Sequence, residues 1–143
     1  MRFARIDAVL TWAYAAMFGL PAIPVAVYHL NTTGRLPRFL DLFEMYGGPW
    51  SDQLGVGAFA ALLIAFVLVL MVSALAAWLV WRGSRVGAIL SLVLLPVEIV
   101  FWLGFALPVP WAFGIARVVL LALAWGSLTP TGGRSSRGEA ART

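Results

Sequence analysis

Two charged residues inside otherwise apolar segments are the strongest candidates for chemistry in this chain. Glu98 lies in the middle of Val86–Leu107, and Arg117 lies in the next apolar segment. A charged side chain at membrane depth is costly, so it is generally paired, faces a cavity or serves a function. A buried carboxyl can be the titrating group of a proton relay or a binding site, and a guanidinium can pair with it.

The short Pro108–Pro110 turn makes the two segments antiparallel neighbours. Phe101 is then level with Arg117, and Glu98 lies about one helical turn, or about 5 Å, deeper. An arginine side chain can span that offset. We therefore predict a buried Glu98–Arg117 pair that fixes the register of the two helices. The alternative is a functional site in which Glu98 binds a ligand or a proton.

The alternative requires a cavity around Glu98. Pro96 removes a backbone donor two residues before Glu98. A kink beside a carboxylate is typical of a hydrated cavity, but also of an ordinary bent membrane helix. Thr11 and Ser73 could add polar groups, whereas Asp7 is expected at the boundary as a cap or rim charge. The cavity or binding candidates are Tyr14, Ser91, Pro96, Trp102, Phe105 and Phe113.

Other reaction chemistry has little support in the sequence. The chain has no cysteine and one histidine, His29, which leaves little for a haem or a copper site. No Ser-His-Asp set, metal cluster or phosphate-binding loop occurs in the sequence. We predict no catalytic residue, no metal ligand and no cofactor, and we expect a protein that is not an enzyme.

The composition predicts that the polypeptide folds in a membrane. Of 143 residues, 62% are hydrophobic and 11% are charged, against about 45–50% and about 25% in ordinary soluble domains. Apolar runs at 8–30, 54–81, 86–107 and 111–128 are each near the length of a spanning helix. The predicted fold is an all-α integral membrane protein, a bundle of four transmembrane helices forming a single domain over residues 1–128.

Arginine positions predict the orientation. Seven arginines fall on the side of the two chain ends, whereas Arg35 and Arg38 fall on the other side. The positive-inside rule then gives a multi-pass protein of the cell membrane with both termini cytoplasmic. The arginines lie at segment ends and in the tail rather than in a basic stripe, so no nucleic-acid partner is expected. Residues 129–143 are expected to form a basic flexible tail.

The outer loop, residues 31–53, predicts a short interfacial helix. Leu36, Phe39, Leu40 and Phe43 recur at helical spacing, after a start at Pro37 and before Gly47 and Gly48. Tyr46 and Trp50 would anchor it at the interface. Pro21 and Pro24 are expected to bend or break the first span.

Small residues recur every four positions in two spans. Such stripes allow close helix packing, within the bundle as the first prediction and between two copies as the alternative. The packing candidates are Gly57, Ala61, Ala65, Gly114, Ala122 and Gly126.

Three functions fit the sequence. The first is an accessory or scaffold component in the lipid bilayer, with a membrane-protein partner or as a homo-oligomer. The second is a small-solute or proton-coupled transporter or channel that uses Glu98, although the arginine asymmetry argues against dual topology. The third is a membrane-embedded binder or enzyme for a lipid-like ligand.

Overall fold

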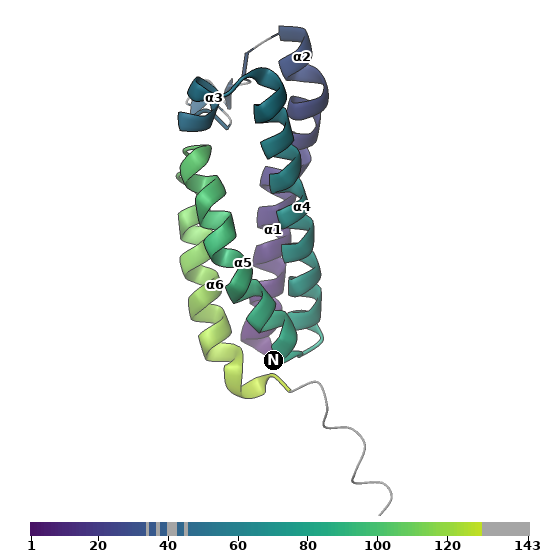
Figure 1. Cartoon of the computed structure of the whole chain (residues 1–143). Helices are drawn as coiled ribbons and strands as arrows, with labels where there is room; N and C mark the ends of the chain where they lie inside the picture. The colour runs from purple at the N-terminus through teal and green to yellow at the C-terminus, as the bar shows by residue number, and fades with distance from the viewer. Residues whose placement is uncertain (34, 37, 40–42, 45, 130–143) are drawn as a thin grey trace, which may run out of the picture.

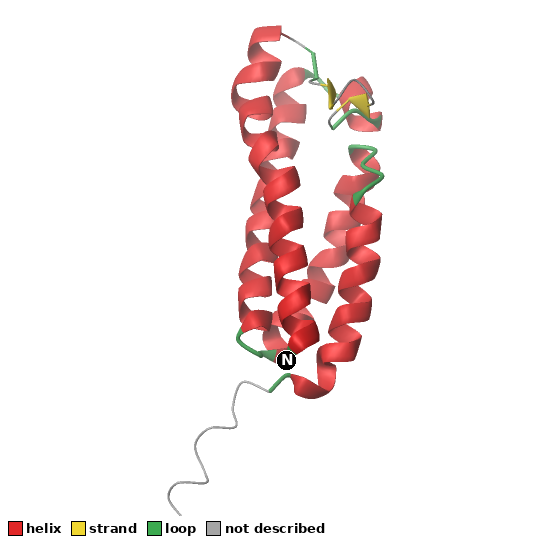
Figure 2. Cartoon of the chain, turned by 180° about the vertical axis from the view of Figure 1, so that it is seen from behind, coloured by secondary structure: helices red, strands yellow, loops and turns green. Residues whose placement is uncertain are grey.

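Four long helices run side by side in the computed structural model, which describes residues 1–33, 35–36, 38–39, 43–44 and 46–129 (Figures 1 and 2). They are α1 (Arg2–Pro24), α4 (Val56–Trp81), α5 (Arg85–Gly104) and α6 (Pro110–Ala124). α1 packs along α4 and α6, and α5 packs along α4 and, less closely, α6. All four candidate spans are long and apolar enough to cross a membrane, as the sequence predicts.

The two ends of the bundle differ. We call the end that carries Met1, the α4–α5 turn and a 3₁₀ turn at Trp125–Ser127 the terminal end (Figure 1). We call the opposite end, with the described residues between 30 and 55 and the α5–α6 turn, the loop end. Thr129, the last described residue, is held to the α4–α5 turn because its N–H donates to the carbonyl of Gly83.

Both short turns end a helix in the same way. Gly83 has φ +80° and donates to the carbonyl of Val80, while Ser84 donates to that of Leu79. This is the Schellman pattern, in which two N–H groups after the helix bind carbonyls that have no partner within the helix. Ala106, with φ +47°, ends α5 with the same pair of bonds, and Pro110 then opens α6.

The first span continues past its prolines. α1 ends at Pro24, a π-helical segment follows over Val25–His29, and α2 (Leu30–Thr33) completes the run. Of the predicted bend or break, the structure shows no break, but the α-helix does change to a π-helix directly after Pro24. The wider π turn directly after Pro24 is one of the ways in which a helix accommodates the missing donor and the bulk of the proline ring.

The predicted helix in the loop is also wrong where the structure describes it. Arg38–Phe39 (β1) and Phe43–Glu44 (β2) pair as short antiparallel strands, and a helix appears only at Pro49–Gln53 (α3). Pro37 and Leu40 lie outside the described residues. Helical spacing over eight residues is a weak signal, because an isolated helix of that length is marginal.

Tyr46 anchors the loop inside the bundle rather than at its surface. Its side chain is fully buried, and its hydroxyl donates to the carbonyl of Phe18 at 2.5 Å. Burial raises the pKa of the Tyr46 phenol. Its φ of +61° is uncommon for a bulky residue, so the surrounding packing must hold it there.

The interior is divided into three layers along the bundle axis. At the loop end lies an aromatic layer, and at the terminal end lies a cluster of Ala4, Val80, Ala88, Leu121, Ala124 and Leu128. Between them lies a polar layer, because on α4 and α5 its residues fall between those of the other two layers. The aromatic layer consists of Tyr46, Trp50, Phe59, Phe66, Phe101 and Phe105, and the polar layer of Asp7, Thr11, Ser73, Ser91, Glu98 and Arg117.

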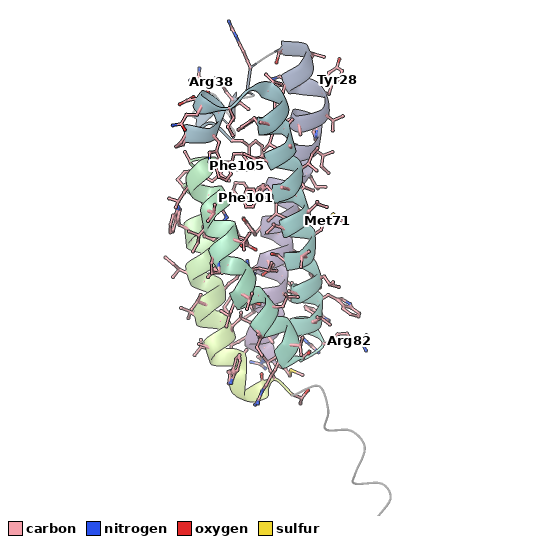
Figure 3. The ribbon with its side chains drawn as sticks, in the orientation of Figure 1. Tyr28, Arg38, Met71, Arg82, Phe101 and Phe105 are labelled. Carbon is pink, nitrogen blue, oxygen red and sulfur yellow. The ribbon has the colours of Figure 1, made fainter. Side chains whose placement is uncertain are left out.

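Figure 3 shows why the aromatic layer is needed. Phe101 and Phe105 fill the space between the α5 and α4 ribbons, whereas Tyr28 and Met71 point outward. Phe101 meets Phe66 of α4 at a ring-centroid distance of 5.4 Å. At the terminal end the same two helices touch closely, since a Cβ on Gly87 would lie 2.7 Å from the carbonyl oxygen of Ala76. The helices diverge towards the loop end, and large rings fill the gap.

Candidate functional site

The structure brings Glu98 and Arg117 together in the polar layer. Arg117 Nη1 donates to Glu98 Oε2 at 2.7 Å, and the Ser73 hydroxyl donates to Glu98 Oε1. Glu98 is 0% exposed and Arg117 is 1% exposed. The carboxylate of α5 therefore joins α4 and α6, and both of its oxygens have a donor. A buried pair with such partners can offset part of its large desolvation cost.

The rest of the polar layer is much less well paired. Among the described residues, six buried polar atoms have no hydrogen-bond partner: Asp7 Oδ1 and Oδ2, Thr11 Oγ1, Ser91 Oγ, and Arg117 Nε and Nη2. Native interiors leave few such atoms, so each calls for an explanation. The unpartnered atoms come from α1, α5 and α6, whereas the Glu98 carboxylate is well paired.

Asp7 does not lie at the boundary where the sequence predicted it. It is fully buried rather than at the rim, in the same layer as the Arg117 guanidinium. A usable signal was present in the sequence. Asp7 precedes Thr11 by four residues and Tyr14 by seven, so all three share one helix face. The buried residues of α1 follow this face.

Tyr14 and Trp102 close the polar layer on the side of the aromatic layer. The Trp102 indole N–H donates to the Tyr14 hydroxyl at 2.7 Å. The Phe113 ring lies 5.7 Å from that of Tyr14. Gly114 makes room for the Trp102 ring, because a Cβ there would lie 2.6 Å from it. Three of the cavity candidates thus meet above the ion pair, and Gly114 admits an indole ring between α5 and α6.

Other candidates lie elsewhere. Ser91 is buried in the polar layer, but Phe105 belongs to the aromatic layer. Pro96 is exposed on the outer face of α5, which runs through it as a continuous helix. A proline on that face lines no interior cavity, so the structure corrects its assignment.

Most of the small-residue stripe points outward, which corrects the prediction of packing inside the bundle for those positions, whereas Ala65 does pack against the core. Gly57 and Ala61 are exposed and Ala65 is half-buried on α4, while Ala122 and Gly126 are exposed near the end of α6. A Cβ on Gly57 or Gly126 would meet no atom within 4 Å. Towards the loop end the inward positions of α4 hold larger side chains, because the diverging helices leave space to fill there: Phe59, Leu63, Phe66 and Leu70.

Three surface clefts are lined by described residues, and neither Glu98 nor Arg117 lines any of these three. The largest, about 560 Å³, lies at the loop end beside Arg35, Arg38, Glu44 and Asp52. A second, of about 260 Å³ between α5 and α6, is apolar and reaches Trp102 and Gly114. Within the described residues no group of three or more His, Asp and Glu side chains could hold a metal ion.

Arginine–tryptophan contacts surround the terminal end. Arg82 lies 4.9 Å from the ring centre of Trp78, and Arg5 lies 5.4 Å from that of Trp81. Arg85 lies 5.9 Å from the ring centre of Trp125 and also donates to the carbonyl of Leu128. Such cation–π contacts hold the guanidinium groups at the same level as the aromatic rings.

Comparisons of this chain with protein-family models, with curated proteins and with solved structures give no match.

Proposed function

We propose that this chain is a multi-pass membrane protein without catalytic activity of its own, an accessory or scaffold component whose helix packing is fixed by Glu98 and Arg117. Four long apolar helices support the membrane assignment. The main support for a structural role is that both oxygens of Glu98 have donors from neighbouring helices. A carboxylate so engaged is suited to hold helices together rather than to meet a solute.

We propose a location in the cell membrane with both termini in the cytoplasm. Arg5, Arg82 and Arg85 gather with tryptophan rings at the terminal end. Arginine-rich ends favour the cytoplasmic side, and tryptophan favours the membrane interface. The neighbouring lipid bilayer is then the first partner of the protein.

The second partner is another membrane helix, from a different protein or from a second copy of this chain. Gly57 and Ala61 are exposed, and nothing in the bundle requires their small size. In lipid, small residues on an outer helix face allow another backbone to approach closely. No cofactor and no nucleic acid are part of the proposal.

The test of the structural pair compares Glu98→Gln, Arg117→Met and the double variant in purified, full-length protein. Each single change leaves one buried polar partner behind, so we expect a lower folded yield and a lower unfolding midpoint in mild detergent. The double change removes both charges, so no buried charge is left without its counter-charge from the pair, and it should recover much of the loss. Glu44→Gln, at an exposed carboxylate of the loop, is the matched control.

A different outcome would favour the transporter alternative. If both single variants fold as well as the wild type, the pair has no structural role. If Glu98→Gln also abolishes proton-driven flux in vesicles, the protein is a transporter. The lipid-like ligand alternative would use the cleft beside Trp102, and a ligand whose binding is lost in Trp102→Ala would support it.

The partner helix is tested by crosslinking in membranes at low expression. Replacing Gly57 and Ala61 with leucine should abolish the crosslinked complex without changing the unfolding midpoint. Ala112→Leu, at an exposed position of α6, should leave the complex intact. A complex that survives the α4 changes, or no complex in the wild type, would reject this partner surface.

A further inference from the structure

The polar layer contains two carboxyl groups and one guanidinium. Glu98 on α5, Asp7 on α1 and Arg117 on α6 are each at most 1% exposed. The helix α4 contributes no charged side chain to this layer. The buried polar side chains that accompany the three charged groups are Thr11 and Tyr14 of α1, Ser91 of α5 and Ser73 of α4. With both carboxyls ionised, Arg117 would compensate only one of two buried negative charges.

The two carboxyl groups have unequal surroundings. Glu98 accepts hydrogen bonds from Arg117 and Ser73. Asp7 accepts none from the described residues at either oxygen. An ionised carboxylate away from water needs donors, whereas a neutral carboxyl loses far less by burial. Of the two groups, Asp7 is therefore the one suited to carry a proton.

A proton fits this place better than a metal cation. The Arg117 guanidinium is buried in the same layer and would repel a second cation placed there. A metal ion would also need several oxygen ligands arranged around it. A proton needs a single carboxyl oxygen and turns that group into a donor.

We propose that the polar layer is a proton-binding site, with the proton on Asp7 while Glu98 and Arg117 are paired. The protonated layer is neutral overall, because one carboxylate faces one guanidinium. When the proton leaves to solvent, Arg117 faces two carboxylates. Its Nε and Nη2 atoms, which have no partner among the described residues, are then available to Asp7. This binding and release of a proton does not depend on the accessory role proposed above.

The test is infrared spectroscopy of the full-length protein at neutral pH in a detergent without ester groups, because lipid esters absorb where a protonated carboxyl does. A protonated carboxyl gives a C=O stretch that an ionised carboxylate lacks. We expect this band in the wild type, and we expect it to shift when aspartate carrying ¹³C in its side-chain carboxyl is incorporated. A band that shifts with labelled glutamate instead would place the proton on Glu98 and overturn the proposal, as would no band.

Variants separate Asp7 from the other aspartates. Asp7→Asn should abolish the band and keep the wild-type folded yield, because asparagine resembles the neutral carboxyl in shape. Asp52→Asn, at an exposed loop position, should change neither. A loss of folded yield in Asp7→Asn as large as that in Glu98→Gln would show Asp7 to be an ionised partner of Arg117 and would overturn the proposal. Isotope labelling needs no variant, so it decides even if a variant misfolds.

Discussion

The aromatic layer and the polar layer fill the same four-helix interior by opposite means. In the first, rings from α4, α5 and the loop occupy the gap between diverging helices, with centroid distances such as 5.6 Å between Phe66 and Phe105. In the second, a few hydrogen bonds connect three helices, and six polar atoms of described residues stay unpartnered. Ring packing is non-directional and tolerates exchange of similar shapes. Buried charge pairing is directional and fails when one partner is removed.

The largest effect expected from this contrast is at Arg117. Arg117→Met keeps the volume but removes the only cation of the layer, so we expect a loss of about 3–5 kcal/mol in the free energy of unfolding. The measurement is denaturant unfolding in mild detergent. The contrast would fail if this loss were no larger than that of a ring replacement in the aromatic layer.

The boundary between the layers should be the next most sensitive point. Gly114→Ala places a Cβ where the Trp102 ring lies, so the indole must shift away from the Tyr14 hydroxyl. We expect a loss of about 1–3 kcal/mol, as for other overpacked interiors. Gly57→Ala, where the added carbon meets open space, is the matched control and should lose nothing. Equal effects at both glycines would contradict the packing described here.

The aromatic layer should tolerate an exchange of shape. Phe66→Leu leaves an apolar side chain among Phe101, Phe105 and Tyr46, and we expect a loss of about 1 kcal/mol, since the exchange roughly preserves volume. The same unfolding experiment measures it, with Met71→Leu at an exposed position as control. A loss comparable to that of Arg117→Met would mean that both layers depend on directional contacts.

The smallest effect should come from the one described hydrogen bond that ties Tyr46 to the first span. Tyr46→Phe removes the donor to the Phe18 carbonyl, and we expect a loss of about 1 kcal/mol at neutral pH. Burial raises the pKa of the folded phenol above its ordinary value of about 10. The folded chain therefore holds this proton where the unfolded chain loses it.

The contribution of Tyr46 is thus complete below about pH 10 and declines as the pH rises above that value. The Tyr46→Phe variant should therefore lose less of its unfolding free energy than the wild type as the pH rises above about 10. Unfolding midpoints measured across this range in the wild type and the variant give the comparison. If the unfolding midpoints of both proteins fell equally with rising pH, the Tyr46 phenol would not have a different pKa in the folded and unfolded chains.

Several features could be predicted because they depend on local sequence. The structural helices 56–81, 85–104 and 110–124 differ by a few residues from the predicted spans. The Pro108–Pro110 turn correctly indicated that Arg117 could reach Glu98. The loop could not be predicted in the same way, because its short strands and the burial of Tyr46 depend on contacts with α1, α4 and α5.

The sequence by itself determined four apolar helices and two charges that had to meet or be compensated. Both follow from hydropathy and turn length, which depend only on the order of residues along the chain. The tertiary structure decided which side of each helix faces inward. α4 is apolar almost all round, so nothing in its residues tells a core position from a lipid-facing one. The outward rotation of Gly57 and Ala61 accompanies the divergence of α4 from α5, where large inward rings fill the space. The inward position of Asp7 is seen only in the packed structure.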